Sequence, residues 1–291
     1  MAIDQSKRVR RITESIISLP TLPTVIAKML ELVDNPKTSA SSLSNLVMRD
    51  QVLTAKILKM ANSSFYAFPR QIATVKLALV VLGFENVKEM ALSLSVLNSF
   101  KGENTKHFDT SLFWQHSIAV GACTRMIARD TCYRLAGEAF VAGLLHDIGK
   151  VVLNQYLPDE FAEIQSLIFE RGKSTEEAEM AVLGVTHAEV GGWLAERWNL
   201  PVILVEAIKY HMHPELCPRN SELALMVYLS DYLSTKCGLG KSGSKGTDTV
   251  PGPLLDLARK ILSITPEGLD AFIPSLYAEY DKASSFMIEA G

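Results

Sequence analysis

Apolar residues recur at helical spacing along nearly the whole chain, and this periodicity constrains the fold more than any other feature of the sequence. In the first such stretch the apolar residues are Val25, Ile26, Met29, Leu30 and Val33. Residues able to cap a helix precede several later stretches, namely Asp50, Asp109 or Thr110, and Thr186 with Glu189. Because strand-like alternation is almost absent, the sequence predicts an all-α protein.

Polar and flexible segments divide this series of helices. The stretch KGENTKHFDT, residues 101–110, is the best candidate for a boundary between two halves. The stretch GLGKSGSKGTDTVPG, residues 238–252, is rich in glycine and serine, which predicts a mobile loop. Two amphipathic helices, at about 253–263 and 266–285, are expected to close the chain.

The composition is typical of a compact cytoplasmic protein. Of the 291 residues, 48% are hydrophobic and 21% are charged, so a sizeable core is feasible. A formal net charge of −3 gives no general attraction for nucleic acid, and no nucleic-acid partner is expected. No apolar run approaches the ~20 residues of a membrane helix, and the N-terminus lacks the residue order of a signal peptide. The four cysteines form no CxxC pair and are expected to be reduced.

The stretch AFVAGLLHDIGKVVL, residues 139–153, places a histidine and an aspartate at the end of an apolar helical run. A buried carboxylate without compensation costs several kcal/mol, so Asp147 needs a partner. One explanation is a salt bridge with Lys150 or Arg125. The other is a metal ion shared by Asp147, His146 and residues elsewhere in the chain.

Further candidate ligands lie in segments that read as separate helices, so each helix of a bundle can direct one ligand to a common centre. These candidates are His116, His187, His211 and Asp231. Imidazole nitrogens and carboxylate oxygens suit Fe, Mn, Zn, Co or Ni. Taken singly, each histidine has an ordinary explanation as a core or surface residue, and Asp231 can bind a backbone amide. His107 and His213 are expected at the surface, although His213 is close enough to His211 to replace it.

The order His116, His146 with Asp147, and Asp231 resembles the HD superfamily of metal-dependent phosphohydrolases, of which HDIGK is the most recognisable motif. The stretches HAEVGGWLAERWNLP and YHMHP, with His187 and His211, resemble the extra histidines of its two-metal subgroup. This resemblance implies that one metal is held by His116, His146, Asp147 and Asp231. Asp147 then bridges to a second metal held by His187 and His211.

The N-terminal half resembles the HDOD family, the HD-related output domain of bacterial signalling proteins. The stretches that carry this resemblance are LPTLPTVIAKMLELVDNP, LVMRDQVLTAKILKMANSSFY and IATVKLALVVLGFENVKEMAL. It implies a two-lobed helical bundle, with an N-terminal HDOD lobe at 1–104 and an HD-like lobe at 105–291. Many members of the family lack the metal ligands, whereas this chain keeps the matching set. The two-metal subgroup includes the HD-GYP enzymes, which hydrolyse cyclic di-GMP. Their HHExxDGxGYP motif is missing here, so hydrolysis of cyclic di-GMP is not expected.

Two functions follow from these resemblances. The first is a signalling output protein whose metal site, with one or two divalent ions, senses or binds a phosphorylated small molecule or nucleotide. Such a protein is expected to act with other signalling proteins and without a membrane. The second is an active metal-dependent phosphohydrolase, in which Asp147 and Lys150 are the catalytic residues and Lys150 orients the phosphate. A structural alternative for Lys150 is a cation near a helix C-terminus.

Overall fold

Helices make up the regular structure of the described part of the chain. The computed structural model describes residues 21–33, 35–66, 68–100, 104–134 and 136–290. Within those ranges no strand occurs, and the predicted all-α class is confirmed. Among the helices described there, none combines the length and the apolar character that a bilayer-spanning segment requires.

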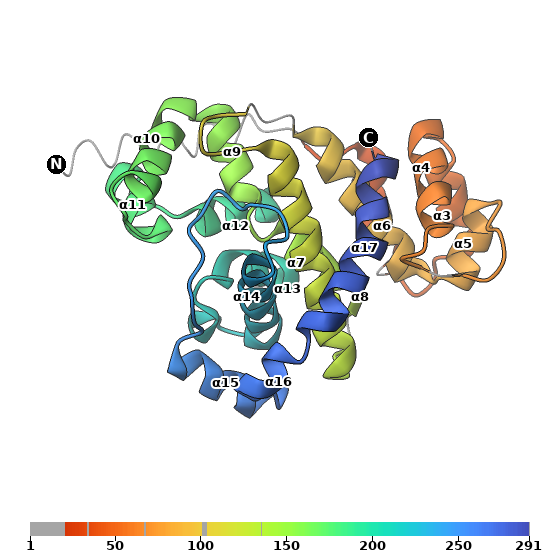
Figure 1. Cartoon of the computed structure of the whole chain (residues 1–291). Coiled ribbons are helices and arrows are strands. Elements are labelled where there is room, and N and C mark those ends of the chain that lie inside the picture. Colours follow the sequence, from red (N-terminus) through yellow and green to blue (C-terminus); the bar gives the residue numbers. More distant parts are fainter. Residues whose placement is uncertain (1–20, 34, 67, 101–103, 135, 291) are drawn as a thin grey trace.

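The N-terminal lobe contains five of the described helices and lies at one side of the molecule (Figure 1). They are α2 (Thr24–Val33), α3 (Ala40–Val47), α4 (Gln51–Ala61), α5 (Val75–Val81) and α6 (Phe84–Ser99). The expected boundary at 104/105 falls between α6 and the next helix. The start of the polar stretch that suggested it, residues 101–103, lies outside the described residues.

The C-terminal lobe contains the longest described helices and the cluster of histidines. Its first half consists of α7 (Thr110–Asp130), α8 (Ala136–Leu145), α9 (Ile148–Tyr156), α10 (Pro158–Phe169), α11 (Thr175–Val182) and α12 (His187–Arg197). Its second half consists of α13 (Val202–Tyr210), the 3-10 turn η1 (Pro214–Leu216), α14 (Ser221–Lys236), α15 (Gly252–Leu262), α16 (Pro266–Asp270) and α17 (Ile273–Ala290). Helix α17 packs against α7 and also contacts α4 and α6, so it links the two lobes (Figure 1).

The caps read from the sequence begin the helices where they were expected. Asp50 accepts a hydrogen bond from the backbone N–H of Leu53 at 2.9 Å, at the start of α4. At the start of α7, Asp109 caps in the same way. Thr186 and Glu189 form a reciprocal capping box at the start of α12, which places the helix's first residue, His187, in a defined position.

The end of the chain differs from the prediction in one respect. The helix expected at about 266–285 is two helices, α16 and α17, separated at residues 271–272. The cause is Pro274, the second residue of α17, which has no N–H and whose ring would collide with the carbonyl of Asp270 in a continuous helix. The break allows α17 to turn back across α7.

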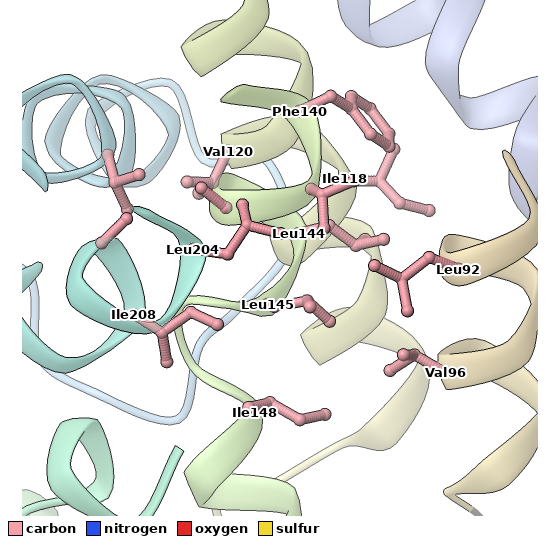
Figure 2. Close-up of a cluster of buried hydrophobic side chains, with 14 of the residues drawn as sticks. Leu92, Val96, Ile118, Val120, Phe140, Leu144, Leu145, Ile148, Leu204 and Ile208 are labelled. Atoms are coloured by element: carbon pink, nitrogen blue, oxygen red, sulfur yellow. The ribbon is translucent and has the colours of Figure 1, made fainter. Parts of the chain in front are cut away.

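One continuous apolar core runs through both lobes (Figure 2). In Figure 2, Leu92 from α6 faces Ile118 from α7 and Leu144 from α8, and the cluster continues to Leu204 on α13. These four side chains are almost fully buried. The polar residues that follow Leu144 along the chain are thus held at the edge of a rigid core.

A pair of oppositely charged residues, Glu89 of α6 and Arg125 of α7, is buried beside this core. The Glu89 side chain is 1% exposed, and its Oε1 lies 3.8 Å from Nη1 of Arg125. The guanidinium of Arg125 also lies over the rings of Phe65 and Tyr66, at 4.3 and 5.2 Å from their centroids. Burial outweighs the attraction of Arg125 and raises the pKa of Glu89 to about 7.

We therefore expect stability to fall as pH rises from about 4.5 to above 7. In that range the folded protein holds a proton on Glu89 that the unfolded chain has released, so the stabilisation is complete below the unfolded pKa and lost above the folded one. The expected loss is about 3 kcal/mol. Urea unfolding of wild type and Glu89→Gln from pH 4.5 to 6, below the range in which His187 contributes, tests this, because the variant should lose the slope there. The exposed Glu163→Gln should keep the wild-type slope, and an unchanged slope in Glu89→Gln would contradict the assignment.

Candidate metal centre

His146 and Asp147 lie in the turn between α8 and α9. Asp147 is the N-cap residue of α9, but its carboxylate makes no capping hydrogen bond and is available for other partners. Both side chains are buried, with 0% and 2% exposed, and His146 Nε2 lies 3.3 Å from Asp147 Oδ2. Since the two residues lie in a turn rather than within one helix, their side chains can reach a common site.

The two carboxylate oxygens of Asp147 face different imidazoles. Oδ2 faces His146, whereas Oδ1 lies 2.9 Å from Nε2 of His187 and 3.6 Å from Nε2 of His211. His187 opens α12 and His211 directly follows α13, so three separate segments converge here. A carboxylate with imidazoles on both sides has the arrangement needed to bridge two ions.

His116 and Asp231 complete the cluster. His116 comes from α7 and Asp231 from α14, and Nε2 of the first lies 2.9 Å from Oδ1 of the second. Oδ1 of Asp231 also lies 4.0 Å from His146 Nε2. The Asp231 side chain is 38% exposed, whereas the other residues of the cluster are buried. All six candidate ligands therefore meet, and Asp231 lies on the side open to solvent.

Two groups within the cluster have the spacing of a metal site, and they share Asp147. One group is His116, His146 and Asp147, and the other is Asp147, His187 and His211. Within each group, the possible ligand atoms lie within 4.8 Å of one another. The cluster can thus hold a metal ion on either side of the Asp147 carboxylate.

The hydrogen bonds of the four imidazoles direct their Nε2 atoms toward these positions. In each ring Nδ1 faces an oxygen, which is the carbonyl of Leu239 for His116, Gly143 for His146 and Ile208 for His211, and the carboxylate of Glu179 for His187. Because these oxygens accept hydrogen bonds, we assign a proton to Nδ1 of each ring, which leaves Nε2 as the atom that can bind a metal ion. Metal-binding histidines are commonly oriented by such bonds.

The electrostatics of the cluster favour a bound cation. Burial alone would raise the pKa of Asp147, but His146 and Lys150 hold it well below its usual range. Burial lowers the pKa of His187, but the Glu179 and Asp147 carboxylates outweigh this and raise it to about 9. A proton therefore remains on His187 at neutral pH, and a metal ion would replace it. The buried Nε2 of His146 makes no hydrogen bond, so the residues present fit a metal ion.

Lys150 lies in the first turn of α9 and is almost fully buried. Its Nζ donates to Asp147 Oδ2 at 2.6 Å and to Ser244 Oγ at 2.7 Å. Of the two salt bridges considered for Asp147, the one with Lys150 is present, whereas Arg125 instead faces Glu89. The alternative, in which Lys150 is a cation that stabilises the C-terminal end of a helix, does not fit its position in the first turn of α9.

The structure also identifies partners that the sequence did not reveal. Glu179 on α11 is 1% exposed and accepts hydrogen bonds from both the ring and the backbone N–H of His187. Leu239 and Ser244 take part through the segment that was expected to be a mobile loop. His213 lies outside the cluster and is paired with Glu176, with 44% of its side chain exposed, as expected of a surface residue.

We expect Glu179→Ala to weaken metal binding by about 10 to 100-fold, because His187 loses the acceptor that orients its ring. Glu179→Gln should have a smaller effect, since an amide still offers one acceptor. Titration of metal-free protein with Mn²⁺ or Zn²⁺ measures this. The control is Glu176→Gln on the same helix, whose imidazole partner His213 is outside the cluster, and equal affinities for all three variants would contradict the role of Glu179.

Comparisons with known proteins agree with this fold. The HDOD domain family matches residues 19–214. An uncharacterised protein of Treponema pallidum is 25% identical over 210 residues, and the match covers 71% of this chain but only 40% of that longer relative. This chain thus spans about two fifths of the relative's length.

Solved structures show the same arrangement over nearly the whole chain. An HDOD domain protein of unknown function from Geobacter sulfurreducens is 28% identical, with a TM-score of 0.77 over 96% of this chain and 98% of its own. A candidate phosphohydrolase from Shewanella amazonensis is 24% identical, with a TM-score of 0.75 over 97% and 98%. A candidate signal transduction protein from Marinobacter aquaeolei is 23% identical, with a TM-score of 0.77 over 99% and 66%. By the family match over most of its length, this chain belongs to the HDOD domain family.

Proposed function

We propose that this protein binds one or two divalent metal ions at the His–Asp cluster and, through them, a phosphorylated small molecule or nucleotide. Its role would be that of a cytoplasmic signalling protein in a bacterium, acting with other signalling proteins. The observation that carries the proposal is the orientation of the imidazoles. Four Nε2 atoms converge on Asp147 and Asp231, while each Nδ1 is hydrogen-bonded to a backbone carbonyl or to the Glu179 carboxylate. Histidines that bind metal are commonly oriented in this way.

Each residue of the cluster would have a distinct role in binding the metal ions and the ligand. One ion would be held by His116, His146, Asp147 and Asp231, and a second by Asp147, His187 and His211. Ions at these positions would polarise phosphoryl oxygens and activate water. Lys150 places a positive charge 2.6 Å from the shared carboxylate, where it would also attract an anionic phosphate oxygen. Asp231, with its exposed side chain, marks the side from which the ligand would approach.

The signalling role is supported by the N-terminal lobe, for which a simple phosphohydrolase has no need. The HDOD match begins at residue 19 and includes helices α2 to α6. The Marinobacter protein of similar fold is named for signal transduction. A lobe joined to the metal-binding lobe through a shared core and α17 is suited to transmit a ligand-dependent change to a partner protein.

The proposal is tested on protein purified without chelator. Elemental analysis should find one or two metal ions per chain. Calorimetry with inorganic phosphate, nucleoside monophosphates and cyclic nucleotides should then find a ligand whose binding disappears when the metal is removed and returns when it is restored. Protein without bound metal, or a ligand that binds equally well after chelation, would contradict the proposal.

Hydrolysis is the second candidate function, because Lys150 and a bridging carboxylate lie together beside an exposed acidic ligand. In that case metal-loaded protein should cleave members of a panel of phosphomonoesters and phosphodiesters. Lys150→Ala should lower the rate by at least about 100-fold when metal is supplied at saturating concentration. Activity that survives Lys150→Ala unchanged would remove this residue from the mechanism.

A further inference from the structure

The segment after α14 has an unusual relation to the candidate metal centre. We call residues 239–244 the strap. In Figure 1 the blue chain between α14 and α15 passes beside α9 and α7 before it returns to α15. The strap lies outside residues 19–214, the part of the chain that the family match covers. Leu239 and Ser242 in the strap are each only 8% exposed, so it packs against the protein rather than extending into solvent.

The first half of the strap packs directly on α7 around His116. The carbonyl of Leu239 faces Nδ1 of His116 at 3.3 Å, and the backbone N–H of Lys241 donates to the carbonyl of Leu112 at 2.9 Å. Between them, Gly240 has a φ of +71°, and a Cβ there would lie 2.2 Å from the His116 backbone nitrogen. Only glycine permits this approach, so the sequence of the strap is adapted to His116.

The second half of the strap reaches α10 and α9. The side-chain amide of the buried Gln165, on α10, donates to the carbonyl of Gly243 at 3.1 Å. Ser244 accepts from Lys150 at 2.7 Å, and the same ammonium donates to Asp147. The strap is therefore bonded to α7, α9 and α10, although it connects α14 to α15.

We propose that the strap is a closing element of the metal centre, whose seating and metal occupancy are coupled. Seated, it supplies the acceptor that orients His116 and the hydroxyl that holds Lys150 beside Asp147. Lifted, it would leave both groups without these partners. Thermodynamic linkage then requires that a metal ion stabilises the seated strap to the same extent as the strap improves metal affinity. This inference rests on the proposed function, because it assumes that the cluster binds metal.

The first test compares Gly240→Ala with Gly252→Ala. The Cβ at residue 240 would prevent the strap from seating on α7, whereas a Cβ at residue 252 meets no atom within 4 Å. Titration of metal-free proteins with Mn²⁺ should show about 10 to 100-fold weaker binding in Gly240→Ala and wild-type affinity in Gly252→Ala. Circular dichroism establishes that both are folded. Wild-type affinity in folded Gly240→Ala overturns the inference.

The second test does not need the glycine variant. In hydrogen exchange followed by mass spectrometry, strap peptides of wild type should become at least about 10-fold slower to exchange when Mn²⁺ is added. Ser244→Ala, which removes only the bond to Lys150, should exchange faster in the strap and bind Mn²⁺ more weakly. Strap exchange that does not respond to Mn²⁺ overturns the coupling. If wild type binds no metal at all, the proposed function fails instead, so the two failures are distinguishable.

Discussion

The Asp147→Asn protein is expected to bind divalent metal at least about 100-fold more weakly than wild type. The two oxygens of Asp147 face His146 on one side and His187 with His211 on the other, so this residue belongs to both halves of the cluster. An asparagine has the same shape but presents an NH₂ group to one of the two sides and carries no charge. Elemental analysis after purification, followed by Mn²⁺ titration, measures the loss.

Two further proteins make this result interpretable. Asp147→Asn leaves the buried ammonium of Lys150 without its carboxylate, which destabilises the protein. The double variant Asp147→Asn/Lys150→Met removes both charges and keeps a folded comparison available. Asp256→Asn, at an exposed position of α15, should bind metal as wild type does. Wild-type metal content in a folded Asp147 variant would contradict the assignment of the cluster.

Gly149→Ala should destabilise the fold by about 3 kcal/mol or more. A Cβ at this position would lie 2.0 Å from the carbonyl oxygen of His187 and 2.9 Å from the backbone nitrogen of Gly191. Both contacts are with the backbone of α12, so no side-chain rotation relieves them and the two helices must separate. Since α9 follows Asp147 directly and α12 begins with His187, their separation should also weaken metal binding.

Urea unfolding in the presence of EDTA measures the effect on stability, and Mn²⁺ titration measures the effect on the centre. Gly252→Ala is the control, because an added Cβ at the start of α15 has open space around it and should change stability by less than about 0.5 kcal/mol. Equal stability of the two variants would mean that α9 and α12 are not held as closely as the Gly149 contact requires.

Much of this architecture could be read from local sequence. Caps such as Asp50 and Asp109 act within three residues of themselves, and helical periodicity depends on neighbours a turn away, so both can be recognised without the tertiary structure. The break at Pro274 also has a local cause, but the amphipathic pattern on both sides of it predicted one continuous helix. The residues of the cluster were candidates because their types suit a metal ion and lie in separate helical segments, and their order also resembles a known superfamily.

The partners of those residues could not be read in the same way. Glu179 resembles any other acidic residue on a helix surface, and only the packing of α11 on the start of α12 buries it against His187. The segment 238–252 has the composition of a flexible linker, and its glycines instead allow close contact with His116 and Phe108. A glycine-rich composition is compatible with either a flexible loop or a close backbone contact, and only the neighbouring residues in the folded protein decide between the two.

The sequence alone thus determined the helical class, the HDOD resemblance and which six side chains were candidates for one metal site, because these depend on local periodicity and on residue identity. The tertiary structure decided that the six side chains meet and that Asp147 faces imidazoles on both sides. It also decided that Glu179, Leu239 and Ser244 support the site. Hydrogen-bond direction and burial depend on the spatial arrangement of helices far apart in the chain, and no local pattern encodes that arrangement.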